Sequence, residues 1–334
     1  MTLLETFREY EFAAEMGDLV IDSDQSIRFS VLCNGTKVLD EEYCPDAQNT
    51  IRVRHLDAFC LLPLWGNLKE GFQKSQCGRF EWQVGGVTQS QTYVFFSRHR
   101  HGHWIFTQGA FSEVRQKVLG PAMQDYVSGL LMDETDGTRY YRVWATGLDG
   151  QTTYLKVPVE TDFTQGDYAY TLHIGPDDVA ALTGVADGVR YGVEFRGGGM
   201  SWFTDKRPCA TQGQLLFRND FDLPETAYFC GRLSMTAQHE RETALVGGTE
   251  RTFGVRQNDS YTLKSGPLRL GSDYRLWRSV AQSTELFLLD KSGGRTPIVV
   301  DKYKIEPQGK GGAMQEVELT FHLAEEKATM PTIG

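Results

Sequence analysis

The sequence predicts a mainly β protein, built from two or three antiparallel β-sandwich or barrel domains with a few short helices. Short runs of alternating apolar and polar residues recur along the chain, and Gly, Asn, Asp and Pro separate them. An aromatic share of 12% and 35 glycines also favour strands joined by tight turns. Because 334 residues exceed one ordinary sandwich, we expect more than one domain.

The first predicted domain, residues 1–135, begins with a hairpin. IRFSVLC alternates as a strand, Asn34-Gly35 supplies a two-residue turn, and TKVLDEEY returns. NTIRVRHL predicts another strand, and the apolar run LDAFCLLPLW predicts a short helix near 55–66. These patterns indicate a β domain with one helix beside it.

The later part of this domain contains two apolar runs, FEWQV and TYVFFS, which predict strands. HWIF (103–106) is expected to continue the sheet. The segment 107–130 fits either one or two amphipathic helical turns or an irregular excursion, and its pattern does not choose between them. A turn at 133–137 (DETDG) marks the end of the domain.

The second predicted domain, residues 136–205, is a central antiparallel module. RYYRVWA, TTYLKVPVE and YAYTLHI are strand-like runs separated by polar or Gly-containing turns, and VRYGVEF is a fourth. Pro176 opens a short helix that Gly184 closes, in agreement with the preferences of proline and glycine at helix ends.

The third predicted domain, residues 206–334, contains one amphipathic helix at 272–283. Tyr274, Trp277, Val280 and Ala281 recur there at helical spacing, after Ser272 as a possible N-cap. GQLLFRNDFDLPETAYFCGRLSM predicts two strands before it. ELFLLD, PIVVDKYKIEP and EVELTFHLAEE predict strands after it, and 236–252 is expected to be a polar segment.

The net charge of −10 argues against nucleic acid or an anionic membrane as the main partner, because both need a basic face. The chain shows neither a signal-peptide core nor a long apolar run, so we expect a cytoplasmic protein without a transmembrane segment. The six cysteines are widely spaced and fit buried thiols in a reducing compartment better than disulfides or a zinc site. They are Cys33, Cys44, Cys60, Cys77, Cys209 and Cys230.

The most distinctive chemical pattern is Arg98-His-Arg-His-Gly-His103. On a strand, His99, His101 and His103 would share one face, where their imidazoles could converge on a metal ion. The intervening arginines fit a solvated, basic strand end and disfavour a cation. We therefore assign no metal site and keep the three histidines as the candidate cluster.

No pattern in the chain indicates a catalytic centre. GxSxG, HExxH and phosphate-loop motifs are absent, and the paired carboxylates lie at turns. We therefore predict a non-enzyme with no catalytic residue and no cofactor. Most of the six tryptophans lie in strand-like apolar runs and are expected in the core. Trp202, beside glycines and Asp205, is kept as the candidate for stacking on a sugar.

Three stretches resemble a family of phage and prophage structural proteins from Bacteroidetes, in particular distal-tail or tail-tip proteins. They are VIDSDQSIRFSVLCNGTKVLDEEYCPDAQNTIRVRHL, LFRNDFDLPETAYFCGRL, and LWRSVAQSTELFLLD with PIVVDKYKIEP and VELTFHLAEE. The resemblance implies a structural role without a catalytic site. Residues 107–210 match nothing in this family, and a receptor- or sugar-binding insertion would lie there.

Two functions are compatible with these observations. The first is a structural subunit that associates with itself and with other tail proteins, located in the cytoplasm until it joins a virion-like particle. A closed ring of such subunits requires a heterologous interface, and therefore an uncovered sheet edge or apolar patch. The alternative is a carbohydrate-binding β-sandwich of a gut bacterium, with a glycan as partner and exposed tryptophans as the platform.

Overall fold

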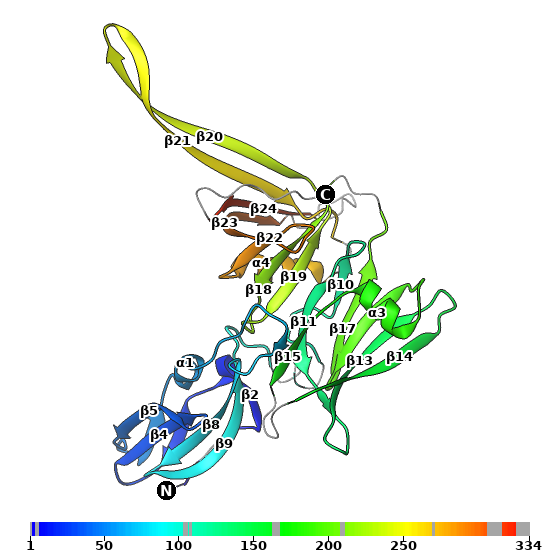
Figure 1. Ribbon diagram of the computed structural model, residues 1–334. Coiled ribbons are helices and arrows are strands. Elements are labelled where there is room, and N and C mark those ends of the chain that lie inside the picture. The colour runs from blue at the N-terminus through cyan, green and yellow to red at the C-terminus, as the bar shows by residue number, and fades with distance from the viewer. Residues whose placement is uncertain are drawn as a thin grey trace, which may run out of the picture. The chain divides into compact units, whose positions relative to one another are not determined.

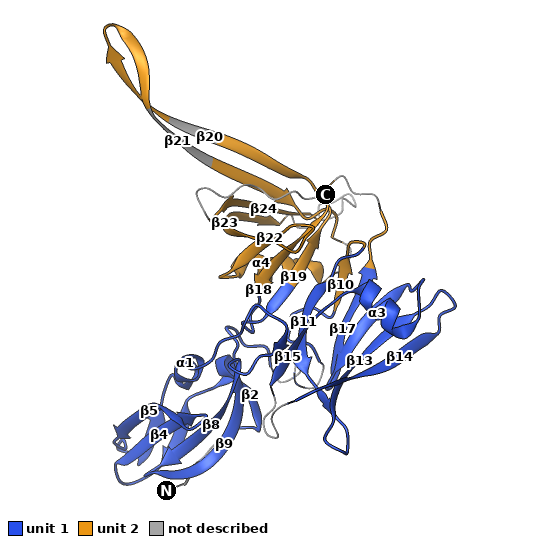
Figure 2. Ribbon diagram, viewed as in Figure 1, with its two compact units in different colours: residues 1–115, 122–203, 218–225 blue, residues 116–121, 204–217, 226–334 orange. Residues whose placement is uncertain are grey.

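The chain forms two compact units, which are coloured separately in Figure 2. Unit 1 comprises residues 1–115, 122–203 and 218–225, and unit 2 comprises residues 116–121, 204–217 and 226–334. The computed structural model describes residues 2–3, 7–102, 106, 109–161, 168–207, 211–268, 271–305 and 316–324.

The mainly β class predicted from the sequence is confirmed (Figure 1). Within the described ranges the strands form several open sheets and no closed barrel. Nearly all neighbouring strands run antiparallel, and the pairing of β2 (Tyr10–Phe12) with β9 (Val87–Phe95) is parallel. Among the described residues, the α-helices are α1 (Leu56–Leu61), α3 (Pro176–Thr183) and α4 (Asp273–Gln282). None of the helices in the described part of the chain has the length and apolarity needed to cross a membrane.

Unit 1 begins with a five-stranded sheet in the order β2-β9-β8-β4-β5. Its predicted hairpin is present: Asn34 and Gly35 have φ angles of 50° and 80°, which is the backbone of a tight two-residue turn. A small sheet, β1-β3-β6, lies in the same unit. The remaining strands of these two sheets are β1 (Thr2–Leu3), β3 (Leu19–Asp22), β4 (Ile27–Cys33), β5 (Thr36–Tyr43), β6 (Thr50–Val53) and β8 (Cys77–Val84).

Alternation along these strands fills the core of this part of unit 1. In β8 every second side chain is buried, and Trp82 on that strand is fully enclosed, with its indole Nε1 donating to Thr92 Oγ1 at 3.2 Å. A second cluster joins four phenylalanines, Phe12, Phe95, Phe111 and Phe221, with smaller apolar side chains. Its ring centroids lie 5.3 to 6.4 Å apart, a spacing that favours tilted and edge-on packing.

Two further sheets of unit 1 contain the strands predicted for the central module. One has the order β11-β15-β7, and in the other β13 pairs with β12, β14 and β16, which in turn pairs with β17. Gly129 on β11 packs so closely on Phe195 that an added Cβ would lie 2.4 Å from the ring. The bounds are β7 (Gly71–Phe72), β11 (Asp125–Leu130), β12 (Met132–Asp133), β13 (Arg139–Thr146), β14 (Thr152–Val159), β15 (Ala169–Ile174), β16 (Arg190–Phe195) and β17 (Gly198–Thr204).

Two segments differ from their sequence patterns or lie outside the description. The ambiguous stretch 107–130 contains two strands, β10 (Gln116–Leu119) and β11, so the helical interpretation of FSEVRQKV is wrong. The expected strand at 103–106 lies mostly outside the described residues, since 103–105 are not described.

Unit 2 is organised by a seven-stranded sheet in the order β19-β18-β22-β23-β24-β21-β20. Helix α4 buries Leu276, Trp277 and Val280, while Tyr274 of the predicted stripe is exposed. Ser272 is the N-cap residue, but its side chain makes no capping hydrogen bond. The strands are β18 (Gly213–Arg218), β19 (Pro224–Phe229), β20 (Leu233–Val246), β21 (Thr249–Lys264), β22 (Leu286–Leu289), β23 (Arg295–Ile305) and β24 (Val317–Leu323).

The cysteines described by the structure are free thiols. Cys33, Cys60 and Cys77 are buried as expected, whereas Cys44 is exposed. Burial raises the pKa of the Cys33 thiol to about 11, and burial also raises the pKa of Cys60. Cys209 lies outside the described residues.

Thiol labelling tests this arrangement. In a Cys209→Ser background, a maleimide should modify Cys44 of the native protein within minutes, because only the exposed thiolate reacts readily. Cys33, Cys60 and Cys77 should react only after denaturation. Mass spectrometry of peptides after timed labelling measures the rates, and equal rates at Cys44 and Cys60 would contradict the fold.

Candidate functional site

The longest element of unit 2 is a two-stranded ribbon, β20–β21 (Figure 1). Its tip is Gly247-Gly248, whose φ angles of 62° and 82° are those of a tight turn that favours glycine. β20 has 14 residues, and at about 3.3 Å per residue it spans roughly 46 Å. A usual strand of about five or six residues is much shorter.

Most of this ribbon lacks a third strand. Only Tyr261–Lys264, at the base of β21, pair with β24. Among the strands that the structure describes, the rest of β21 pairs only with β20, and β20 pairs only with β21. Both outer edges of the ribbon therefore present backbone N–H and C=O groups to solvent or to a partner.

The ribbon also exposes large apolar side chains. Leu245 is 77% exposed and Phe253 is 69% exposed, and both lie near the tip. Val246 and Met235 are exposed by 53% and 55%. A register shift between Glu242 and Thr243 places Phe253 in a bulge of β21, which bends and twists the ribbon there.

The sequence indicated a polar segment at 236–252 without assigning strands there; its described side chains are exposed, and most of it lies in β20 and β21. Its residues are polar because neither face of the ribbon packs against the sheet core, so the usual alternation of a half-buried strand is missing. The signal that could have located the hairpin is Gly247-Gly248, which lies between the short strand-like runs TALV and TERTF.

Two of the three predicted histidines of unit 1 lie close to one aspartate. The Nδ1 atom of His99 lies 2.7 and 2.8 Å from the carboxylate oxygens of Asp220. The Nε2 atom of His101 lies 2.9 Å from Oδ2 of the same residue. These histidines follow β9 in a loop instead of a strand, and His103 lies outside the described residues.

Glu113 completes this cluster. Ligand-type atoms of His101, Glu113 and Asp220 all lie within 4.8 Å of one another. Phe221 packs its ring 4.5 Å from the imidazole of His101, and Phe12 lies edge-on at 6.3 Å. The polar groups are therefore set against the aromatic core of unit 1. Sequence reasoning did not identify Asp220 or Glu113, because no local pattern pairs residues so far apart in the chain.

Asn219 holds the loop that carries Asp220. Its Oδ1 accepts from the backbone N–H groups of Phe221 and Leu223, and its Nδ2 donates to the carbonyl of Phe111 and to Glu225. All these bonds are buried. The loop is thus fixed by backbone hydrogen bonds that only a side-chain amide at this position completes.

Asp222 adds three more restraints to the same loop. Its carboxylate accepts from the backbone N–H of Gly66 at 2.7 Å and from Arg98 and Arg218 at 3.0 Å each. Its own backbone has a φ angle of 61°, a left-handed conformation that aspartate tolerates better than most residues. The loop geometry is therefore imposed by its surroundings.

The electrostatics of Asp220 agree with the geometry. Burial alone would raise the pKa of this carboxyl, but the imidazoles of His101 and His99 outweigh burial and lower the pKa below its ordinary value. The carboxylate form of Asp220 is therefore stabilised where the two histidines approach it.

Trp202 is not a binding platform, and this prediction is wrong. Its side chain is fully buried in unit 1, and its indole Nε1 donates to Asp125 Oδ2 at 3.0 Å. The adjacent glycines of β17 permit close strand packing: a Cβ on Gly199 would lie 1.7 Å from the carbonyl oxygen of Val193. Glycine here marks tight packing and not an open surface.

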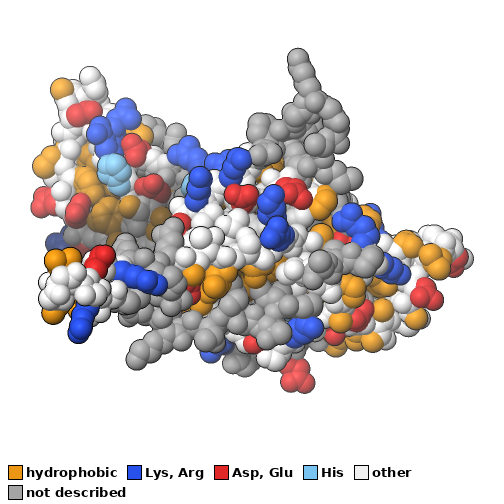
Figure 3. Space-filling view, turned by 90° about the horizontal axis from the view of Figure 1, so that it is seen from above, with side chains coloured by type: hydrophobic (Ala, Val, Ile, Leu, Met, Phe, Trp, Pro, Cys, Tyr) orange, Lys and Arg blue, Asp and Glu red, His pale blue; other side chains and the backbone are white. Residues whose placement is uncertain are grey.

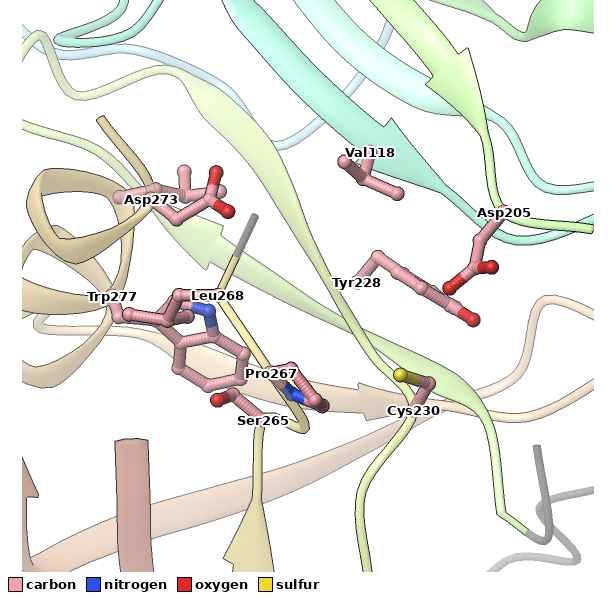
Figure 4. Close-up of a pocket in the computed structure, with 10 residues that line it drawn as sticks. Val118, Asp205, Tyr228, Cys230, Ser265, Pro267, Leu268, Asp273 and Trp277 are labelled. Atoms are coloured by element: carbon pink, nitrogen blue, oxygen red, sulfur yellow. The ribbon is translucent and has the colours of Figure 1, made fainter. Parts of the chain in front are cut away.

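A small pocket lies in unit 2 (Figure 4). Figure 4 shows Asp205 beside Tyr228, and Trp277 of α4 beside Leu268 and Pro267. Its volume is about 30 Å³, with room for one or two water molecules. A sugar ring does not fit this space.

Comparisons with known proteins give distant structural likenesses only. No family model and no curated protein matches the chain. Among solved structures, a chain in the virion of a native gene transfer agent (GTA) particle is 15% identical, covering 33% of this chain and 91% of that chain at a TM-score of 0.23. A chain in the tail of an empty GTA particle is 13% identical, covering 30% and 83% at a TM-score of 0.23.

The third likeness is to the full extracellular region of plexin A4, at 9% identity, covering 96% of this chain and 36% of that chain with a TM-score of 0.18. At TM-scores this low, none of the three likenesses establishes a shared fold, and no functional assignment rests on them.

Asn219→Ala tests the loop. The substitution leaves two buried N–H groups without an acceptor, so we expect the free energy of unfolding of unit 1 to fall by about 2–4 kcal/mol. Urea unfolding followed by tryptophan fluorescence measures it. Gln89→Ala is the control. It removes an exposed hydrogen bond from the Gln89 side-chain amide to the carbonyl of Val87 and should change stability little. Equal stabilities of the two variants would show that the loop does not depend on Asn219.

Proposed function

We propose that this protein is a non-enzymatic structural subunit of a phage-tail-like assembly, and that it associates with itself and with neighbouring subunits through the β20–β21 ribbon. The observation that carries this proposal is a ribbon of 14 and 16 residues whose edges are paired only at its base. A two-stranded hairpin is marginally stable alone in water. A partner surface would stabilise it.

The chemistry of the ribbon fits docking on another sheet or strand. Its free edges can accept an additional strand through main-chain hydrogen bonds. Leu245 and Phe253 add apolar area near the tip. Burying a side chain of this size contributes about 1.5–3 kcal/mol, so both side chains would contribute substantially to the free energy of binding a partner.

The resemblance of three stretches of the chain to distal-tail or tail-tip proteins supports the same role. The middle stretch, LFRNDFDLPETAYFCGRL, covers the end of β18, the loop of Asp220 and β19, and the last stretch begins within α4 and covers the strands that follow it. They correspond to the framework from which the ribbon extends. We propose a cytoplasmic location before assembly.

The surface shown in Figure 3 suits contacts with other proteins. In this view, hydrophobic side chains of the described residues lie among basic and acidic ones. Mixed surfaces of this type are typical of protein–protein contacts, whereas nucleic-acid surfaces are strongly basic. A net charge of −10 favours the same interpretation.

Glycan binding, the alternative from the sequence, is not carried further. It called for exposed tryptophans, with Trp202 as the candidate platform; Trp202 is fully buried, whereas Trp65 is 53% exposed. The pocket beside Tyr228 and Trp277 is too small for a sugar.

The double variant Leu245→Ser/Phe253→Ser tests self-association. Size-exclusion chromatography with light scattering should show a defined oligomer for the wild-type protein and a shift to smaller species for the variant. Loss of two apolar contacts of about 1.5–3 kcal/mol each should weaken association by at least about 100-fold.

Leu148→Ser is the matched control. Leu148 is 79% exposed in a turn of unit 1, outside the ribbon, and its replacement should leave the oligomer unchanged. A wild-type protein that stays monomeric at all concentrations would refute self-association. So would a double variant that assembles as well as the control.

A further inference from the structure

The cluster of unit 1 has a donor set that suits a metal ion. His101 brings an imidazole nitrogen, and Glu113 and Asp220 each bring a carboxylate oxygen, all within 4.8 Å of one another. In a tetrahedral zinc site with bonds of about 2.0–2.2 Å, neighbouring ligand atoms lie roughly 3.3–3.6 Å apart. Small side-chain rotations would therefore bring the three donors around one ion.

The strongest indication is the Nε2 atom of His101. The side chain is only 7% exposed, and Nε2 is buried without a hydrogen-bond partner, although Oδ2 of Asp220 lies 2.9 Å from it. The two atoms are close but not aligned for a hydrogen bond. A buried nitrogen left in this state is costly, and a metal ion bound by both groups would satisfy it.

The flanking arginines do not occupy this point. Arg98 donates to Asp222 Oδ1 at 3.0 Å, and Nε of Arg100 donates to the carbonyl of Ala14 at 3.2 Å. The sequence argument against a cation depended on their positive charges. Because the guanidinium groups of Arg98 and Arg100 are directed at other acceptors, their positive charges oppose a bound cation less than the sequence suggested.

We propose that His101, Glu113 and Asp220 form a binding site for a divalent transition-metal ion of the zinc class. An imidazole with two carboxylates suits such ions, whereas Ca²⁺ and Mg²⁺ prefer oxygen ligands alone. The two carboxylates balance the charge of the ion. Water or a partner group would supply the fourth ligand.

His99 is a positioning residue in this site. Its Nδ1 atom contacts both oxygens of Asp220, and its own side chain is 61% exposed. An imidazole that orients a ligating carboxylate changes metal affinity by about 10–100-fold when it is removed. His99 therefore holds the carboxylate of Asp220 in place through both of its oxygens.

The site would tie together three separate parts of unit 1. His101 lies after β9, Glu113 precedes β10, and Asp220 lies in the loop held by Asn219. One ion would cross-link these segments beside the aromatic cluster of Phe12 and Phe221. The inferred role is stabilisation of the fold.

Zinc titration of the tag-free, full-length protein tests the proposal. Competition with a chromophoric chelator should show one high-affinity Zn²⁺ per chain, and Zn²⁺ should raise the melting temperature while Ca²⁺ and Mg²⁺ should not. Asp220→Asn and Glu113→Gln should each weaken binding by at least about 100-fold, and His99→Ala by about 10–100-fold.

His322→Ala is the matched control, because His322 forms a similar pair with Asp301 at 2.9 Å, but in an exposed position of unit 2. It should bind Zn²⁺ as the wild type does. Circular dichroism identifies any variant that fails to fold, and His101→Gln provides a second test of the imidazole. The proposal is wrong if the wild type binds no Zn²⁺, or if folded Asp220→Asn and His101→Gln proteins bind as tightly as His322→Ala. Either result would leave a simple His–Asp ion pair.

Discussion

The need to pair backbone hydrogen-bonding groups is the constraint on which this structure depends. In a protein made mostly of strands, each sheet edge leaves a row of N–H and C=O groups that must find water or another chain. Unit 1 divides its strands among several small sheets, and each of these sheets has two short edges of its own. Unit 2 instead extends one edge into the β20–β21 ribbon, far beyond its last neighbour β24. Under the proposed function, a partner would cover these exposed edges.

The loop around Asp220 follows a different principle. Its side chains are polar but lie against aromatic rings, where an unsatisfied group is expensive. Asn219 and Asp222 satisfy several backbone groups at once and leave Asp220 free to face His99 and His101. The ribbon exposes backbone groups to solvent, whereas this loop buries polar groups and satisfies nearly all of them with hydrogen bonds. Beside this loop, the buried Nε2 of His101 has no hydrogen-bond partner.

Local features of the chain were predictable from the sequence. Asn34-Gly35 specified its hairpin because only certain residues accept positive φ angles, and the spacing of Trp277 and Val280 specified one face of α4. Pro176 and Gly184 likewise marked both ends of α3. The division into three domains at about residues 135 and 205 remains a prediction.

Non-local features were not predictable. β11 pairs with β15 across about forty intervening residues, and no local pattern indicates such a partner. The histidine motif pointed to His99 and His101, but their partner Asp220 is distant in sequence and close only after folding. Trp202 looked exposed because glycines surround it, although those glycines are there to allow close packing. The ribbon was missed for the opposite reason, since its lack of a packed face removed the periodicity on which strand prediction relies.

The bulge at Phe253 changes which side chains of β21 lie on each face of the β20–β21 ribbon. Pairs below it join residues of like parity, such as Glu242 with Gly254, whereas pairs beyond it join residues of unlike parity, such as Ala244 with Arg251. The outer third of β21 is therefore out of phase with its inner two thirds. A molecule that contacts the ribbon along its full length would therefore meet even-numbered positions of β21 on one stretch and odd-numbered positions on the other.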